Sequence, residues 1–513
     1  MRLCSFCIIA VLFLSAALLN NSVPGVGEPH YLSKAKAFAQ PDWCSRDFFL
    51  SSGNAHYVFY VLVGPLTKMI SLDAVALLGR GIQFLMFACG WIMLGTTIGL
   101  DGSRRIFSAA VFTILTMLGN FSGEWILGGF EAKVPAWSMC LMTMHFWIRS
   151  HWTAQQPQVD AIKSGFCCGI ACSFHPVVGI WMAICIGMAT LAEQIRRPSA
   201  SHTSRTSLRR LAVFLIISTL FALPGLLPAL RLLSDTSLPD SQKDLANFLQ
   251  VFWRLKHHLD PTQFTLRQWI YTGICSLAIW RLIRRLLPDQ TAMLHVLRIV
   301  LASAIIAAVG VMIGFHIGEA TMIEHWEWRA SLLKFYPFRM IDAFLPMLVA
   351  WLFASVCKPP ISIRTNAATI GMALVTAWIT SAAAPPGYTR AQFDEWKTAC
   401  DWIRNNTPQD ALILTPRESF AFKWYADRAE YVCYKDCPQD AAGILEWNTR
   451  LWNLHDWTLA SSMDGQYHES DLAKAHRLTN CDFIVTRILG PFESQPLWSG
   501  EYWRVYRISP DKP

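Results

Sequence analysis

Ionisable residues gather in short motifs between apolar runs, and the first motif has the residue types of an acid–base site. In the segment GVGEPHYL, Glu28 is followed by His30 and Tyr31, and Asp47 lies further along the same polar stretch. A carboxylate near a membrane surface serves as a general base when its surroundings tune its pKa. Glu28 and Asp47 are therefore candidate catalytic bases, with His30 and Tyr31 as candidate substrate-binding residues. The alternative is a solvated loop with ordinary charges.

The second motif, GGFEAK, places Glu131 and Lys133 two residues apart, directly before an apolar run. Charges that enter a membrane helix are costly, so they usually face a cavity or a partner. Both residues are candidates for substrate binding. An ion pair that only anchors the helix end is the alternative.

The third motif, SFHPVVG, interrupts an apolar run over residues 164–192. This run is too long for one comfortable span and too short for two full ones. Pro176 removes a backbone hydrogen bond, and irregular backbone is tolerated at membrane depth where protein buries it. We therefore expect a broken helix or hairpin, with His175 beside the break as a candidate substrate-binding residue. A hydrogen-bonded core histidine is the alternative.

The fourth motif lies in residues 324–346, where Lys334 and Arg339 precede an apolar run and Asp342 follows one turn later. Arginine and lysine in this position suit a phosphate ligand. Alternatively, Arg339 and Asp342 pair on one helix face, since they are spaced i,i+3. His325 and its acidic neighbours are too loosely arranged to predict a metal site.

The composition indicates what carries these motifs. Of 513 residues, 53% are hydrophobic and 16% charged, against about 25% charged in soluble domains. Several apolar runs approach the length of a bilayer, which excludes a single soluble globule, and the high hydrophobicity excludes intrinsic disorder. The expected fold is therefore an α-helical polytopic membrane protein with about 10–12 spans.

Charge is unevenly distributed along the chain. Residues 385–513 carry 14 Lys and Arg against 18 Asp and Glu, whereas the whole chain has a net charge of +8. The basic residues of the first part form short clusters between apolar runs, as membrane topology requires. Nucleic-acid binding is therefore not expected.

Basic clusters define the expected topology. The loop 193–210, the Arg281–Arg285 segment and the Lys358–Arg364 segment should face the cytoplasm. The N-terminal apolar run is expected to stay as a first span, a cleaved signal peptide being the alternative. The remaining expected spans are 77–99, 106–120, 135–149, 164–192, 211–233, 268–287, 293–315, 338–356 and 365–384.

This topology brings the unusual polar residues to one face of the membrane. The segments expected outside are 20–76, 121–134, the hairpin tip near 175, 234–267, 316–337 and the tail. A rival topology, in which residues 56–72 span and 164–192 cross once, would place several arginines outside and is disfavoured. We place the protein in the plasma (inner) membrane.

The chain divides into a transmembrane domain, residues 1–384, and a soluble extracytoplasmic α/β domain, residues 385–513. Helical patterns at 394–406 and 441–454 alternate with short strand patterns at 411–416, 429–436, 481–488 and 501–508. A further helix is expected over 417–428. Four cysteines, Cys400, Cys433, Cys437 and Cys481, allow one or two disulfides there.

An acid soon after the first span, many spans and an extracytoplasmic C-terminal domain resemble the GT-C superfamily, whose members are polyprenyl-phosphate-sugar-dependent glycosyltransferases. EPHYL, GGFEAK, SFHPVVGIW, YPFR-x-x-D and FKWYADRAEYVCYKD are similar to segments of a set of uncharacterised bacterial multi-pass membrane proteins of that build. The similarity covers most of the chain.

The resemblance implies a one-step inverting transfer of a sugar from a polyprenyl-phosphate donor to an extracytoplasmic acceptor. Glu28 would deprotonate the acceptor hydroxyl, with Asp47 as a second candidate. His30, Lys133, His175 and Arg339 would neutralise the lipid-linked phosphate. Many GT-C enzymes carry an adjacent acidic pair in the first loop, and the first loop of this chain has none. No cofactor is therefore expected, and a divalent metal is not supported.

Two other classes remain open at this stage. A transporter or flippase would use the broken helix at 164–192 as a midplane site, although no inverted repeat is evident. A non-catalytic scaffold of the cell envelope would use the tail to bind a protein partner of unknown identity.

Overall fold

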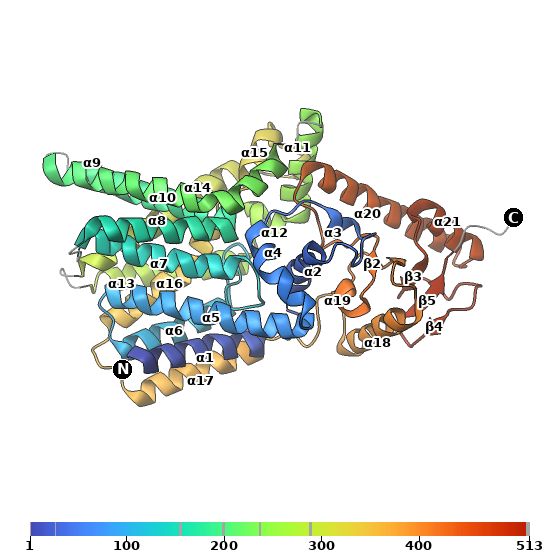
Figure 1. Ribbon diagram of the computed structural model, residues 1–513, viewed down its shortest axis with the longest axis horizontal. Coiled ribbons are helices and arrows are strands. Elements are labelled where there is room, and N and C mark those ends of the chain that lie inside the picture. Colours follow the sequence, from blue (N-terminus) through green and yellow to red (C-terminus); the bar gives the residue numbers. More distant parts are fainter. Residues whose placement is uncertain are drawn as a thin grey trace.

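The computed structural model describes residues 2–25, 27–152, 156–196, 201–234, 238–286 and 290–508. Arg197, one of the basic residues of the predicted cytoplasmic loop, lies outside the described residues. Long helices form a bundle at one end of the molecule, and the C-terminal residues form a smaller unit at the other end (Figure 1).

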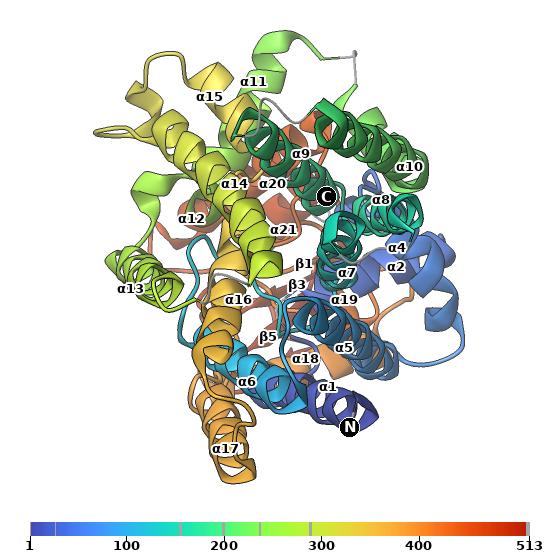
Figure 2. The ribbon, with the colours of Figure 1, turned by 90° about the vertical axis from the view of Figure 1, so that its left-hand side faces the viewer.

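The bundle consists of long, mostly apolar helices that run side by side, as the view along it shows (Figure 2). They are α1 (Arg2–Asn20), α5 (Leu72–Thr97), α6 (Gly102–Leu118), α7 (Lys133–Trp152), α8 (Pro157–Phe174), α9 (Pro176–Arg196), α10 (Ser201–Leu233), α13 (Leu266–Ile283), α14 (Thr291–Gly314), α16 (Arg339–Val356) and α17 (Ile363–Ile379). Helix α1 packs against α5, α6 and α17. One continuous hydrophobic core joins the helices, with Trp91 and Trp351 among its fully buried side chains.

Six helices in the described part of the chain are long and apolar enough to cross a membrane: α1, α5, α9, α10, α14 and α16. The expectation of a multi-pass membrane protein is therefore confirmed. The count of 10–12 spans stays a prediction. It requires that other long helices of the same bundle also cross the membrane.

The predicted break near Pro176 is present. Helix α8 ends at Phe174, His175 is extended, and α9 begins at Pro176. The two helices pack closely, because an added Cβ at Gly179 would lie 2.3 Å from the Cα of Cys172. The rival topology fails at residues 56–72, where α4 (Tyr57–Val63) and η1 (Gly64–Lys68) are too short to span.

Short helices cap the end of the bundle that faces the C-terminal unit (Figure 1). They are α2 (Glu28–Ala39), α3 (Phe48–Ser51), α11 (Asp240–Phe248), η2 (Leu249–Arg254), α12 (Lys256–Leu259), η3 (Pro261–Gln263), η4 (Ala320–Met322) and α15 (Trp326–Leu333). The segment around Glu28 is thus a helix rather than a loop, since Pro29 suits its first turn.

The C-terminal unit is a small mixed sheet with helices on both faces. Its elements are α18 (Arg390–Asn406), β1 (Leu412–Leu414), α19 (Phe422–Ala426), β2 (Ala429–Glu430), α20 (Ala441–Ser462), α21 (Glu469–Thr479), β3 (Phe483–Thr486), β4 (Trp498–Ser499) and β5 (Arg504–Arg507). The strand order is β2-β1-β3-β5-β4. Strand β1 is parallel to β2 and β3, whereas β5 is antiparallel to β3 and β4.

Two details of the unit differ from the sequence expectation. The helix expected over 417–428 is reduced to α19, and the strand expected over 429–436 is reduced to β2. After β2 the chain no longer forms a strand. It bends toward a cluster of buried charged side chains. In addition, all four tail cysteines are free, so the disulfides that their number allowed do not form.

The first polar segment belongs physically to both parts of the molecule. Trp43, Phe49 and Leu50 pack into the same core as Trp447 and Ile484 of the C-terminal unit. Residues 40–50 therefore join the two parts far from the predicted boundary at residue 384.

Candidate functional site

A cavity of about 750 Å³ runs between helices α9, α10 and α14 and ends at polar side chains. Its walls are apolar, with Ile180, Leu226 and Val309 as examples. Its polar end is formed by the side chains Tyr31, His56, His175, Lys334, Tyr336 and Arg339. A cavity with an apolar length and a cationic end fits an amphipathic ligand that carries an anionic head.

Arg339 is the centre of the polar end. Its Nη1 is 3.0 Å from Nε2 of His175, its Nε is 3.3 Å from Oε2 of Glu124, and its guanidinium lies 4.0 Å from the ring centre of Tyr336. The sequence-predicted residues His175 and Arg339 are therefore in contact, although 164 positions separate them.

The contact with Arg339 fixes the tautomer of His175. Because a guanidinium only donates hydrogen bonds, Nε2 of His175 must accept, and the ring proton of a neutral imidazole is then on Nδ1. His175 is buried, and its Nδ1 has no hydrogen-bond partner within the described part of the chain. His175 thus keeps an unused N–H donor beside the guanidinium of Arg339.

Tyr31 and His56 complete this end of the cavity. The Tyr31 hydroxyl is 3.5 Å from Nε2 of His56, whose ring centre lies 4.8 Å from that of His175. Burial lowers the pKa of His56 to about 3, so this imidazole is neutral at pH 7. Burial, and to a lesser degree the charge of Glu131, raise the pKa of Tyr31 well above its usual value. Tyr31 is therefore a hydrogen-bond donor here rather than a phenolate.

Asp342 positions the acidic partner of Arg339. Its carboxylate accepts the backbone N–H groups of Phe121, Ser122 and Glu124 at 2.5–2.8 Å. This holds the turn that carries Glu124 against α16. The i,i+3 pair between Arg339 and Asp342 that the spacing allows does not form in the described structure.

Glu28 is engaged on all sides. Nε and Nη2 of Arg80 each lie 2.7 Å from one of its oxygens, and the backbone N–H groups of Gly25 and Phe130 donate at 2.7 Å. Two donors on each oxygen fill the four acceptor positions of a carboxylate. Both side chains are fully buried. This geometry favours an anchoring role for Glu28, which does not line the cavity.

Asp47 caps helix α3 and holds the C-terminal unit. Its Oδ1 accepts the N–H of Leu50 at 2.9 Å and its Oδ2 accepts the N–H of Glu430 at 3.0 Å. It is 1% exposed. Like Glu28, Asp47 is placed to join segments rather than to meet a substrate.

His30 contacts a buried charge cluster of the C-terminal unit instead of the cavity. Its Nδ1 is 3.1 Å from Oδ1 of Asp436. The Lys423 ammonium lies 2.8 Å from Asp436, 2.9 Å from Glu430 and 3.4 Å from Asp47. These three carboxylates raise the pKa of Lys423 well above its usual value, although burial opposes the shift.

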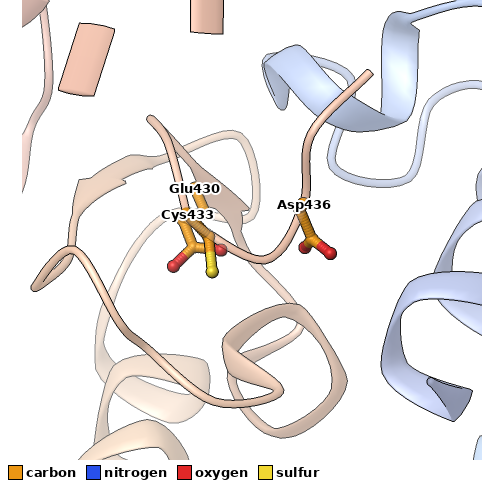
Figure 3. Close-up of side chains that lie close together, drawn as sticks. All are labelled: Glu430, Cys433 and Asp436. Atoms are coloured by element: carbon orange, nitrogen blue, oxygen red, sulfur yellow. The ribbon is translucent and has the colours of Figure 1, made fainter. Parts of the chain in front are cut away.

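This cluster also contains the group of residues with the spacing of a cation site. Glu430, Cys433 and Asp436 offer ligand atoms within 4.8 Å of one another (Figure 3). The ammonium of Lys423 contacts two of them, and the Cys433 thiol donates to the carbonyl of Ser419 at 3.3 Å. The carboxylates of this group are therefore already paired with a cation of the chain itself, the ammonium of Lys423.

Of the remaining predicted residues, Glu131 and Lys133 bind each other, whereas Lys334 lines the cavity. Glu131 and Lys133 pair at 3.2 Å, and Glu131 also accepts the N–H of Gly27 at 3.0 Å. Lys334 lines the cavity and donates to Oδ1 of Asn247 at 3.0 Å. Burial lowers the pKa of Lys334.

Sequence reasoning missed several residues of the site. Tyr336 lies inside the quoted motif YPFR-x-x-D, and Glu124 lies in the segment 121–134 that was expected outside, but neither residue was singled out. Arg80 is a charge within a predicted span, and that fact alone marks a residue with a buried partner. No comparable feature of the sequence marked His56 as a residue of the site.

The fold is GT-C-like. The chain is similar over 99% of its length to a cryo-EM structure of the arabinofuranosyltransferase AftD from Mycobacteria, with a TM-score of 0.50 and 14% identity. The chain spans 40% of the length of that enzyme. This likeness shows the fold alone.

Two further solved structures are similar. The oligosaccharyltransferase AglB from Archaeoglobus fulgidus, in complex with an inhibitory peptide and a dolichol-phosphate, has a TM-score of 0.47 and 13% identity. The match covers 95% of this chain and 69% of that one. ArnT from Cupriavidus metallidurans bound to undecaprenyl phosphate has a TM-score of 0.45 and 12% identity, over 98% of this chain and 97% of that one.

At the level of sequence, residues 394–454 match a domain of unknown function, DUF6798. This segment begins within α18 and ends in the middle of α20. The chain has no significant match among curated protein sequences.

Proposed function

We propose that the protein is a membrane glycosyltransferase that takes a sugar from a polyprenyl-phosphate donor and transfers it, with inversion, to an acceptor outside the cytoplasm. The observation that carries the proposal is the cavity between α9, α10 and α14, because its apolar walls lead to Arg339 and to the unused N–H of His175. A prenyl chain suits the walls, and a phosphate suits the cationic end.

In this proposal Arg339 and His175 hold the phosphate that leaves with the lipid. Negative charge develops on that phosphate as the sugar–oxygen bond breaks, so fixed donors there stabilise the transition state. Lys334 and Tyr31 line the same end and would supply further donors. Lys133 and His30 would act less directly, because each is already paired with a carboxylate.

We propose Glu131 as the base that activates the acceptor hydroxyl. The four acceptor positions of Glu28 are filled, whereas Glu131 receives one backbone N–H and one ammonium. Glu131 does not line the cavity, but its charge acts on Tyr31 and Arg339, which do line it. A base must reach the proton that it removes, and a carboxylate with free lone pairs meets this requirement.

The first experiment identifies the lipid that co-purifies with the protein in detergent, by mass spectrometry. Wild type should retain a polyprenyl phosphate or its sugar adduct, and Arg339→Ala should lose it. Arg267→Ala is the matched control, because Arg267 lies near the same end of the bundle, is exposed, and donates to the carbonyl of Leu118. Bulk phospholipid alone in all three samples would contradict the proposal.

A second variant separates binding from chemistry. Glu131→Gln should keep the lipid but raise the proportion that still carries its sugar, since transfer is blocked after the donor binds. An unchanged proportion would remove Glu131 as the base while leaving the donor site intact.

A further inference from the structure

A second cavity opens in the C-terminal unit, away from the membrane cavity. It has a volume of about 240 Å³ and lies where strands β1 and β3 end, beside helix α20. Its lining includes Leu414, Arg417, Leu454, His455, Thr486 and Arg487. Among the described residues no Asp or Glu lines it.

The topology of the sheet puts this cavity at a position that suits a ligand. Strands β1 and β3 are parallel neighbours. The chain leaves β1 toward β2, which forms one edge of the sheet, and it leaves β3 toward β4, which forms the other edge. Where connections diverge in this way, they leave a crevice outside the carboxyl ends of the strands, and ligands of open α/β sheets bind there.

Thr486, the last residue of β3, brings an unsatisfied polar group into the crevice. Phe483 and Val485 pack into the core under α18, and Ile484 packs into the core under α20. Since side chains alternate along a strand, Thr486 faces α20. It is 3% exposed, and its hydroxyl has no hydrogen-bond partner in the part of the chain that the structure describes. Such a group costs free energy unless a ligand or water meets it.

Basic side chains border the same crevice. Arg417 follows β1, Arg487 follows β3, and His455 lies on α20. Within the described residues, none of the three forms an ion pair. The Arg417 guanidinium lies over the ring of Tyr434 at 4.8 Å. The Arg487 guanidinium donates to the carbonyl of Gly387 at 2.8 Å and lies 5.7 Å from the rings of Tyr388 and Trp503, which belong to the core under α18. A guanidinium has five N–H donors, so Arg417 keeps donors for a ligand in the crevice.

We propose that this crevice binds a ring-sized organic anion. The carboxylate or phosphate of the ligand would meet Arg417, the Thr486 hydroxyl would bond to a polar substituent, and Leu414 and Leu454 would contact the ring. The cavity is smaller than the roughly 300–1,000 Å³ of pockets for drug-sized ligands, which limits the occupant to about one ring. This site is separate from the proposed donor site and does not depend on it.

The test uses the full chain in detergent, both as wild type and with Arg339→Ala, which removes one guanidinium from the membrane cavity. Ligand-observed saturation-transfer NMR compares benzoate with neutral benzamide, and glucuronate or glucose 6-phosphate with neutral glucose. At least one anion should bind, and its neutral counterpart should not. The anion that binds most tightly tells a carboxylate site from a phosphate site. Equal binding of neutral and anionic probes, or no binding at all, would overturn the proposal.

Two variants in the Arg339→Ala background locate the bound anion. Thr486→Val keeps the shape of the side chain and should weaken binding about fivefold, the effect of one lost hydrogen bond. Arg417→Gln should weaken it about tenfold or more, and Arg417 is exposed, so folding is spared. Arg507→Gln is the control, because Arg507 pairs with Phe483 at the opposite end of β3. Unchanged affinity in either test variant would overturn the assignment.

Discussion

Arg80 donates a hydrogen bond to each carboxylate oxygen of Glu28. Its Nε lies 2.7 Å from Oε1 and its Nη2 lies 2.7 Å from Oε2, and neither side chain is exposed. This pair joins α2 to α5 and so fixes the first polar segment on the bundle. A carboxylate that is saturated in this way is a structural tie between two elements.

Glu28→Gln should therefore destabilise the protein. Removing one partner of a buried ion pair leaves an uncompensated charge, here Arg80, at a cost of about 3–5 kcal/mol. Thermal unfolding in detergent measures the loss, with the exposed residue change Glu418→Gln as control. If Glu28→Gln unfolded at the wild-type temperature and lost transfer only, Glu28 would be the base after all.

Glu124→Gln should strengthen retention of the lipid phosphate. Glu124 partly neutralises Arg339 at 3.3 Å, so its removal leaves the full guanidinium charge for an anionic ligand. Quantitative mass spectrometry of the co-purified lipid, normalised to protein, measures the change. Less lipid in Glu124→Gln than in wild type would mean that Glu124 acts mainly by orienting Arg339.

Gly179→Ala should disturb the α8–α9 hairpin. The added Cβ would lie 2.3 Å from the backbone of Cys172, and overpacking of this kind costs about 1–3 kcal/mol. Gly187→Ala is a matched control on the same helix, since no atom lies within 4 Å of its added Cβ. It should be neutral or stabilising by up to about 1 kcal/mol. Equal unfolding temperatures for the two variants would show that the helices separate easily at this contact.

The buried pair of Asp436 and Lys423 should make stability depend on pH. Burial alone would raise the pKa of Asp436, but Lys423 and His30 outweigh it and lower that pKa well below its usual value. A carboxyl with a depressed folded-state pKa contributes stability above its unfolded pKa of about 3.9, and this contribution is lost as the pH falls below it.

The measurement compares unfolding temperatures of wild type and Asp436→Asn between pH 6 and pH 3. At pH 6 the variant should be less stable, and the difference should shrink toward pH 3. Glu430, whose pKa is raised by burial and by the charge of Asp436, has the opposite sign, so the pH dependence of the wild type alone does not report on Asp436. A difference that stays constant with pH would contradict the prediction.

Local patterns of the sequence were enough to predict much of the fold. Apolar runs of bilayer length gave the helices of the bundle, and Pro176 gave the break between α8 and α9. The basic clusters predicted which loops face the cytoplasm, and this prediction placed the polar motifs together at the opposite end of the bundle. These signals depend on residues within one or two helical turns, which a single sequence displays directly.

The sequence by itself therefore determined that this is a multi-pass membrane protein whose chemistry-bearing motifs converge. Only the tertiary structure decided which charged side chains are paired within the protein and which lie at the cavity. Glu28 is paired with Arg80, Asp47 with the C-terminal unit, and Asp342 with a backbone turn, whereas Arg339 and His175 meet at an open cavity. The physical reason is that a buried charge takes its partner from whichever element packs against it, and this choice depends on contacts between residues far apart in the chain.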